Sequence, residues 1–115
     1  MDVYEDLNIN PNLIEKYITK KTKAIMPVHW TGRMCNMQKI KLIAKKHKLF
    51  IIEDAAQAMG ATYKNKFLVT IGGMGGFSFY GNKIITPGEG GVVFFTHSKL
   101  KNKIYSLKNH GSKKN

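Results

Sequence analysis

The sequence has one cysteine, few acidic residues and no long apolar run. The lack of further cysteines and of a long apolar run excludes several kinds of structure. Cys35 is the only cysteine, so the chain forms no internal disulfide and no cysteine-based metal cluster. The absence of a run of about 18 apolar residues excludes a membrane-spanning helix. The first residues are acidic and lack an apolar segment, so they are not a secretory signal. We expect a cytoplasmic protein, since a reducing compartment suits an unpaired cysteine.

Arginine is also scarce, although the chain is strongly basic. The 115 residues include 19 lysines and arginines against seven acidic residues, for a net charge of +12, and Arg33 is the only arginine. A nucleic-acid partner would explain this charge. Bidentate base recognition favours arginine, however, and the lysines are scattered along the chain. We therefore favour a solvated lysine-rich surface, or a fragment that lacks the acidic parts of its parent.

The apolar residues, 43% of the chain, predict an α/β fold within one domain or part of one. Residues 24–28 form a short apolar run with β-branched residues, typical of a strand, and residues 36–48 show helical spacing with lysines on the opposite face. Residues 49–52 are continuously apolar, as in a strand buried on both faces. Strand, helix and strand within about 30 residues make a βαβ unit with a parallel sheet.

Four further segments complete the predicted pattern. Asn10 and Pro11 fit the N-cap and first position of a helix. Residues 77–80 and 91–96 are candidate strands between glycine-rich loops. A last helix is marked by Leu100, Ile104 and Leu107.

Two polar residues stand where a ligand could bind. Asp54 follows the apolar run 49–52, and ligands of open α/β sheets bind beyond the carboxyl ends of strands. Its carboxylate could meet a cationic group, or it could cap the turn that follows. Ser78 follows several glycines, and free N–H groups beside a hydroxyl suit a phosphate. No P-loop sequence is present, so a glycine-rich hairpin is the alternative.

Lys83 lies between an apolar strand and the glycine-rich loop 86–91. A primary amine that is partly removed from water is a nucleophile that forms a Schiff base with an aldehyde or ketone. Taken singly, any of the lysines is more often a solvated charge, so the neighbouring residues must decide.

The neighbouring residues resemble one family. The segments are Ile52-Glu53-Asp54-Ala55-Ala56-Gln57-Ala58, Gly60-Ala61, Gly76-Phe77-Ser78-Phe79-Tyr80-Gly81-Asn82-Lys83 and Gly88-Glu89-Gly90-Gly91. Their order and spacing are similar to those of the DegT family of sugar aminotransferases, which use pyridoxal phosphate (PLP). Residues 79–86 look most like the perosamine synthases within it.

The resemblance implies roles for four residues. Lys83 matches the lysine that binds PLP covalently and then moves the proton during transamination. Asp54 matches the carboxylate that pairs with the pyridine nitrogen, and a nearby negative charge keeps that nitrogen protonated. Gln57 matches a residue beside the cofactor ring, and Ser78 matches a phosphate ligand. Relatives with histidine at the Lys83 position act as dehydratases, so Lys83 favours transamination.

The resemblance also implies a fold, a domain organisation, substrates and an oligomeric state. The fold would be part of the large PLP-binding domain of the aspartate-aminotransferase fold, a mostly parallel sheet with flanking helices. Residues 1–115 would be a partial large domain, without the N-terminal segment and the C-terminal small domain. The substrates would be a nucleotide-linked 4-keto-6-deoxy sugar, of the perosamine type made for surface polysaccharides, and glutamate as amino donor. Relatives are homodimers, and no metal, membrane or nucleic acid is expected.

The remaining polar residues have lesser roles in this interpretation. His29 and His110 match family positions, but a lone histidine is more often structural. We expect Asn82 and Glu89 to shape the loop after Lys83. Packing is expected for Trp30, an inert thiol for Cys35 and a solvated ring for His47.

Two alternatives to an active enzyme remain open. The chain could be an inactive remnant, or a piece of a split enzyme that needs a partner, and a basic nucleic-acid-binding domain is a further possibility. In each case, part of a parallel sheet would leave apolar faces exposed to solvent. We therefore expect the isolated chain to be poorly soluble or oligomeric.

Overall fold

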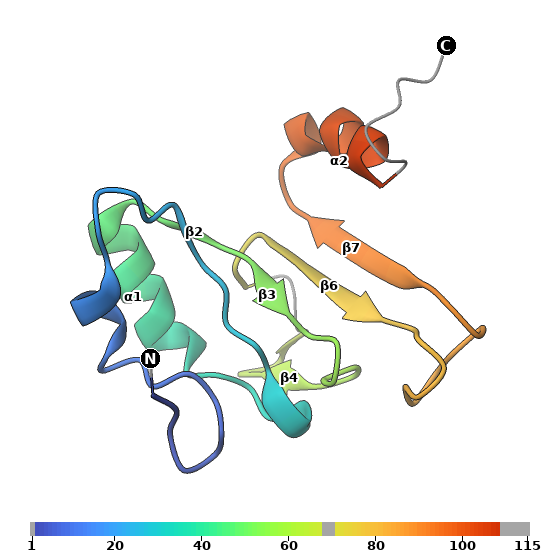
Figure 1. Ribbon diagram of the computed structural model, residues 1–115, viewed down its shortest axis with the longest axis horizontal. Coiled ribbons are helices and arrows are strands. Elements are labelled where there is room, and N and C mark those ends of the chain that lie inside the picture. The colour runs from blue at the N-terminus through green and yellow to red at the C-terminus, as the bar shows by residue number, and fades with distance from the viewer. Residues whose placement is uncertain (1, 68–70, 109–115) are drawn as a thin grey trace.

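The computed structural model describes residues 2–67 and 71–108 (Figure 1). Strands β1 (Ala24–Ile25) and β2 (Phe50–Ile51) pair in parallel and are connected through helix α1 (Met37–His47), which confirms the predicted βαβ unit. Strand β3 (Glu53–Asp54) pairs in parallel with β6 (Met74–Ser78), and β7 (Gly91–Phe95) pairs antiparallel with β6. The α/β class is confirmed, with a mixed sheet.

Backbone hydrogen bonds join these ladders into one continuous sheet. The N–H of Ile52 donates to the carbonyl of Ile25 at 3.0 Å, and the N–H of Asp54 donates to that of Pro27 at 2.9 Å. The N–H of His29 then donates to the carbonyl of Asp54 at 2.9 Å. The segment that follows β1 therefore runs beside β3 and holds it from the side opposite β6.

Helix α1 covers one face of this sheet (Figure 1). Its start is fixed by Asn36, whose side chain accepts the N–H of Lys39 at 3.1 Å, as an N-cap does. The helix ends at Lys48 in the left-handed conformation, with φ 54°. One hydrophobic core includes its buried side chains and those of the adjacent strands and loops: Ile14, Ile25, Cys35, Met37, Ile40, Ile43, Ala44 and Ile51.

The other face of the sheet carries exposed apolar side chains. Successive side chains of a strand point to opposite faces, so Phe50 faces away from the core that holds Ile51. Phe50 is 74% exposed, and Met26, next to the buried Ile25, is 57% exposed. The prediction that residues 49–52 are buried on both faces is therefore wrong for Phe50.

The predicted helix at Asn10 is also wrong. The side chain of Asn10 accepts the N–H of Asn12 at 3.0 Å, which closes a local turn. Only a 3₁₀ turn follows, at Ile14–Tyr17. Within this turn Ile14 is buried in the core, whereas Tyr17 is 57% exposed.

The strand predicted at residues 77–80 starts earlier than predicted and ends at Ser78, so Phe79 and Tyr80 lie outside it. β6 begins at Met74, so part of the glycine run belongs to a strand. A Cβ on Gly76 would lie 3.0 Å from the carbonyl oxygen of Val92, which explains why β7 can approach so closely. The prediction also missed a hairpin of β4 (Thr62–Tyr63) and β5 (Lys66–Phe67).

The C-terminal part agrees with the prediction. Helix α2 (Lys101–Leu107) follows a 3₁₀ turn at Ser98–Leu100 and lies beyond the end of β7, away from α1 (Figure 1). Within the two described stretches, no helix is long and apolar enough to cross a membrane. The predicted family segment at His110 falls outside the described residues.

Candidate active site

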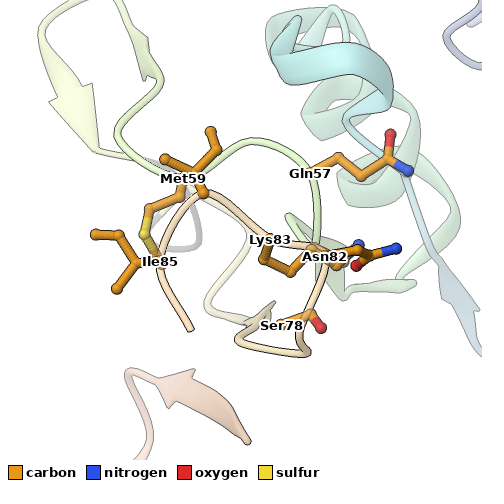
Figure 2. A pocket seen from close by; sticks show the side chains of 8 residues that line it. Gln57, Met59, Ser78, Asn82, Lys83 and Ile85 are labelled. Atoms are coloured by element: carbon orange, nitrogen blue, oxygen red, sulfur yellow. The ribbon is translucent and has the colours of Figure 1, made fainter. Parts of the chain in front are cut away.

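A cavity of about 210 Å³ brings together three of the four predicted site residues (Figure 2). Gln57 reaches it from the loop after β3, Ser78 from the end of β6, and Lys83 from the loop between β6 and β7. The other lining residues are Ala56, Met59, Asn82, Ile84 and Ile85. Amide, hydroxyl and amine groups thus meet at a partly apolar opening that is smaller than a complete small-molecule site of about 300–1,000 Å³.

Asp54 is not among the lining residues but lies on the strand beside them. It pairs in register with Gly76, two residues before Ser78. Paired residues of parallel strands point to the same face, so Asp54 and Ser78 share one side of the sheet. The Oδ1 of Asp54 accepts the N–H of Ala56 at 3.0 Å, so the alternative of a turn-capping aspartate is also realised.

The loop that carries Lys83 is closed by hydrogen bonds at its base. The N–H of Phe79 donates to the carbonyl of Gly90 at 2.9 Å, and the hydroxyl of Thr86 donates to the carbonyl of Phe79 at 2.7 Å. The N–H of Lys83 donates to the carbonyl of Tyr80 at 2.9 Å, closing a turn. Lys83 is half-buried as a result, whereas most lysines of the described chain are exposed. The role of Thr86 was not predicted from the sequence, because its side chain carries no charge to mark it.

Ser78 and Gln57 make weak contacts that leave their polar groups near the cavity. The Oγ of Ser78 accepts the N–H of Tyr80 at 3.4 Å. The Oε1 of Gln57 accepts the N–H of Thr31 at 3.4 Å, which links the site to the 3₁₀ turn at Trp30–Gly32. Both distances are at the long end for hydrogen bonds, so a ligand could compete for these groups.

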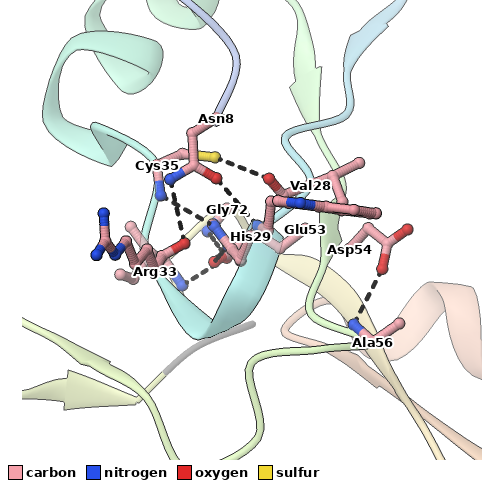
Figure 3. Close-up of polar contacts among 11 residues, drawn as sticks. Asn8, Val28, His29, Arg33, Cys35, Glu53, Asp54, Ala56 and Gly72 are labelled. Atoms are coloured by element: carbon pink, nitrogen blue, oxygen red, sulfur yellow. Dashed lines mark hydrogen bonds and ion pairs between the residues drawn. The ribbon is translucent and has the colours of Figure 1, made fainter. Parts of the chain in front are cut away.

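His29 lies in the interior, where it pairs with Glu53, a partner that was not predicted from the sequence. The ring is fully buried; its Nδ1 accepts the N–H of Cys35 at 3.2 Å, and its Nε2 lies 3.3 Å from Oε2 of the buried Glu53 (Figure 3). Between a direct role in the site and a structural role for His29, the buried position favours the structural role. The only available signal for Glu53 was its place next to Asp54, which puts the two carboxylates on opposite faces of a strand.

The structure also places the remaining polar residues that the sequence singled out. Burial raises the pKa of the Cys35 thiol to about 11, which agrees with the expected inert side chain. His47 is not simply solvated, because its Nε2 lies 2.6 Å from an oxygen of Glu15. Asn82 lines the cavity, while Glu89 is exposed in the loop. The described part of the chain contains no group of three potential metal ligands.

The donor set fits PLP. A half-buried primary amine, a hydroxyl on a strand end and a carboxylate on the same sheet face match its aldehyde, phosphate and ring nitrogen. Ala56 lines the cavity with a minimal side chain that leaves room for a flat ring, whereas Ala55 is fully buried and packs with Ala58.

Known proteins are similar to this chain in sequence and in structure. A GDP-perosamine synthase of Caulobacter vibrioides is 46% identical over 104 residues, covering 90% of this chain and 28% of the relative. The solved aminotransferase from Psychrobacter cryohalolentis has a TM-score of 0.89 and 46% identity, over 96% of this chain and 28% of its own.

A third relative was solved with a cofactor. GDP-4-keto-6-deoxymannose-3-dehydratase, described with a trapped PLP-glutamate geminal diamine, has a TM-score of 0.83 and 32% identity, over 92% of this chain and 28% of its own. The chain spans about 28% of the length of the curated relatives that it matches first. The DegT/DnrJ/EryC1/StrS aminotransferase family matches residues 1–115, and the chain belongs to that family.

Proposed function

We propose that this chain contributes the lysine-bearing half of a PLP-dependent sugar aminotransferase site. The observation that carries the proposal is the cavity, where Gln57, Ser78 and Lys83 converge from three separate segments. Family membership and the solved relatives support the same cofactor. When bound, PLP supplies an electron-withdrawing ring that stabilises negative charge on the carbon of the amino donor.

The residues of this chain have distinct roles in the proposal. Lys83 would hold the cofactor at its aldehyde through Nζ, and the same amine, when free, would move a proton at the reacting carbon. Asp54 holds a proton on the ring nitrogen from the same sheet face as Ser78. Ser78 donates its hydroxyl to the phosphate, and Gln57 donates an amide N–H beside the ring.

The substrate and the assembly belong to the same proposal. The name of the Caulobacter relative favours a GDP-linked sugar of the perosamine type. The name of the third relative and its trapped complex favour a 4-keto-6-deoxy sugar as amino acceptor and glutamate as donor. We place residues 1–115 within a large PLP-binding domain that other segments complete, in a homodimer. An inactive remnant, or a piece that needs a partner chain, is the competing proposal.

Reductive trapping tests the proposal. Purified protein is incubated with PLP, reduced with borohydride, digested and mapped by mass, and we expect the pyridoxyl group to concentrate on Lys83. The matched control is Lys41→Arg, at an exposed lysine of α1, which should leave the adduct unchanged, whereas Lys83→Arg should remove it. Adducts spread evenly over many lysines would favour the inactive remnant.

The same assay tests Asp54. A hydrogen bond to a charged group contributes about 1.5–3 kcal/mol, so Asp54→Ala should lower the occupancy of Lys83 by roughly tenfold or more at limiting PLP. Glu5→Ala removes an exposed carboxylate and should have no effect. An unchanged occupancy in Asp54→Ala would remove Asp54 from the site.

A further inference from the structure

A buried polar cluster lies on the face of the sheet opposite Asp54 (Figure 3). Its centre is Glu53, whose Oε1 accepts the N–H of Ile71 at 3.0 Å and the N–H of Gly72 at 2.5 Å. Its Oε2 lies 3.3 Å from the Nε2 of His29, and neither side chain is exposed. Glu53 thus connects the segment after β1 to the segment that enters β6.

The hydrogen bonds assign the protonation of both side chains. The Nδ1 of His29 accepts the N–H of Cys35, so the ring proton of the neutral form is on Nε2 and points at Glu53. Glu53 then faces at least three N–H donors. An ionised carboxylate, which accepts with both oxygens and donates with neither, satisfies all of them.

This arrangement determines which way Asp54 points. Glu53 and Asp54 are neighbours on β3, so anchoring one side chain on the covered face sends the other to the opposite face. Figure 3 shows the carboxylate of Asp54 turned away from the cluster and toward Ala56. The backbone of His29 adds to this, because its N–H donates to the carbonyl of Asp54 at 2.9 Å.

We infer that His29 and Glu53 form a positioning pair, which holds Asp54 on the face of the sheet that carries Ser78. The inference rests on the proposed function only for what Asp54 does there. Neither residue of the pair contacts the cavity, so both act through the register of β3. An isosteric Glu53→Gln places a donating NH₂ group against His29 or against the two backbone N–H groups, so it breaks the cluster without changing its size.

The first test is nuclear magnetic resonance of the full chain with labelled histidine and aspartate. In the unaltered protein, we expect the ¹⁵N shifts of His29 to be those of a neutral ring with its proton on Nε2. A proton on Nδ1, or a doubly protonated ring at neutral pH, would overturn the inference.

The second test compares variants by the signals of the Asp54 carboxyl carbon and the Ala56 N–H. Glu53→Gln should shift both signals and lower the Lys83 adduct roughly tenfold, whereas Glu5→Gln, an exposed control, should change neither. Where Glu53→Gln does not fold, His29→Gln serves instead, with His97→Gln as its exposed control. Unchanged Asp54 and Ala56 signals in a folded variant would overturn the pair.

The outcomes separate this inference from the proposed function. Signals of Asp54 that respond to Glu53, in a protein that forms no adduct on Lys83, would reject the proposed function and keep the positioning pair. An adduct that forms on Lys83 regardless of Glu53→Gln would keep the function and reject the pair.

Discussion

Gly72 illustrates how closely single residues are constrained around the buried cluster. A Cβ at this position would lie 2.6 Å from Cγ2 of Ile51 and 3.0 Å from its Cβ. A β-branched side chain has little freedom to move away, so Gly72→Ala must displace the backbone whose N–H reaches Glu53.

We predict that Gly72→Ala lowers the free energy of unfolding by about 1–3 kcal/mol, as expected of overpacking. The control is Gly81→Ala, where the nearest atom to the added Cβ is the carbonyl oxygen of Gly88 at 3.6 Å, an ordinary contact. Urea denaturation followed by circular dichroism measures both. Equal losses in the two variants would contradict the argument.

Cys35 gives a second prediction at this scale. The thiolate is disfavoured by burial, which raises the pKa to about 11 from an ordinary 9.0, and the thiol donates to the carbonyl of Val28 at 3.2 Å. The thiol form is therefore dominant at all pH values below about 11 in the folded protein. We expect iodoacetamide to leave the folded protein unmodified at neutral pH and to modify it quantitatively in urea, as measured by mass. Fast modification of the folded chain would show that Cys35 is accessible.

The sequence predicted the cavity residues better than the residues behind them. Lys83, Ser78 and Gln57 were found because a shared pattern of motifs marks them, and the structure brings them together. Glu53 and His29 were harder to predict, because their pairing depends on which strands are neighbours. That information is long-range, and neither residue type alone indicates a buried partner.

At the scale of elements, α1 was the most predictable part of the fold. Its apolar spacing, its N-cap and its lysine face all point to the same structure, and local agreement of this kind makes an element robust. The hairpin of β4 and β5 was missed because its turn residues, Lys64 and Asn65, both have positive φ, 48° and 61°. Turns of this type usually contain glycine, and lysine gives no such signal.

The N-cap of α1 should contribute measurably to the stability of the protein. Asn36→Ala removes the acceptor for the N–H of Lys39 and should lower the free energy of unfolding by about 1 kcal/mol. Lys41→Ala, at an exposed position within the helix, should change it by less than about 0.5 kcal/mol. Thermal melting of the three proteins decides, and an Asn36→Ala protein as stable as Lys41→Ala would show that the cap contributes nothing.

At the scale of the whole molecule, the described chain is less compact than an independent domain. Its Cα radius of gyration is 15.1 Å, whereas about 13 Å is typical of a compact domain of this length. Figure 1 shows α2 beyond the end of β7, apart from α1, which lengthens the molecule, and it shows no helix across the second face of the sheet. Strand alternation places Met26, Phe50 and Asp54 on that second face. The proposed site lies on this open face, as a site completed by other segments would.

This open face predicts self-association of the chain when it is produced alone. Phe50 is 74% exposed, and Met26, two residues after the strand partner of Phe50, is 57% exposed on the same face, so this face presents apolar side chains to solvent. Phe50→Ser should shift the chain toward monomer in light scattering coupled to gel filtration, without lowering its melting temperature. Leu42→Ser is the matched control, because Leu42 is 64% exposed but lies on α1, away from the sheet face. A chain that is already a monodisperse monomer with a cooperative melt would show that the open face does not drive association.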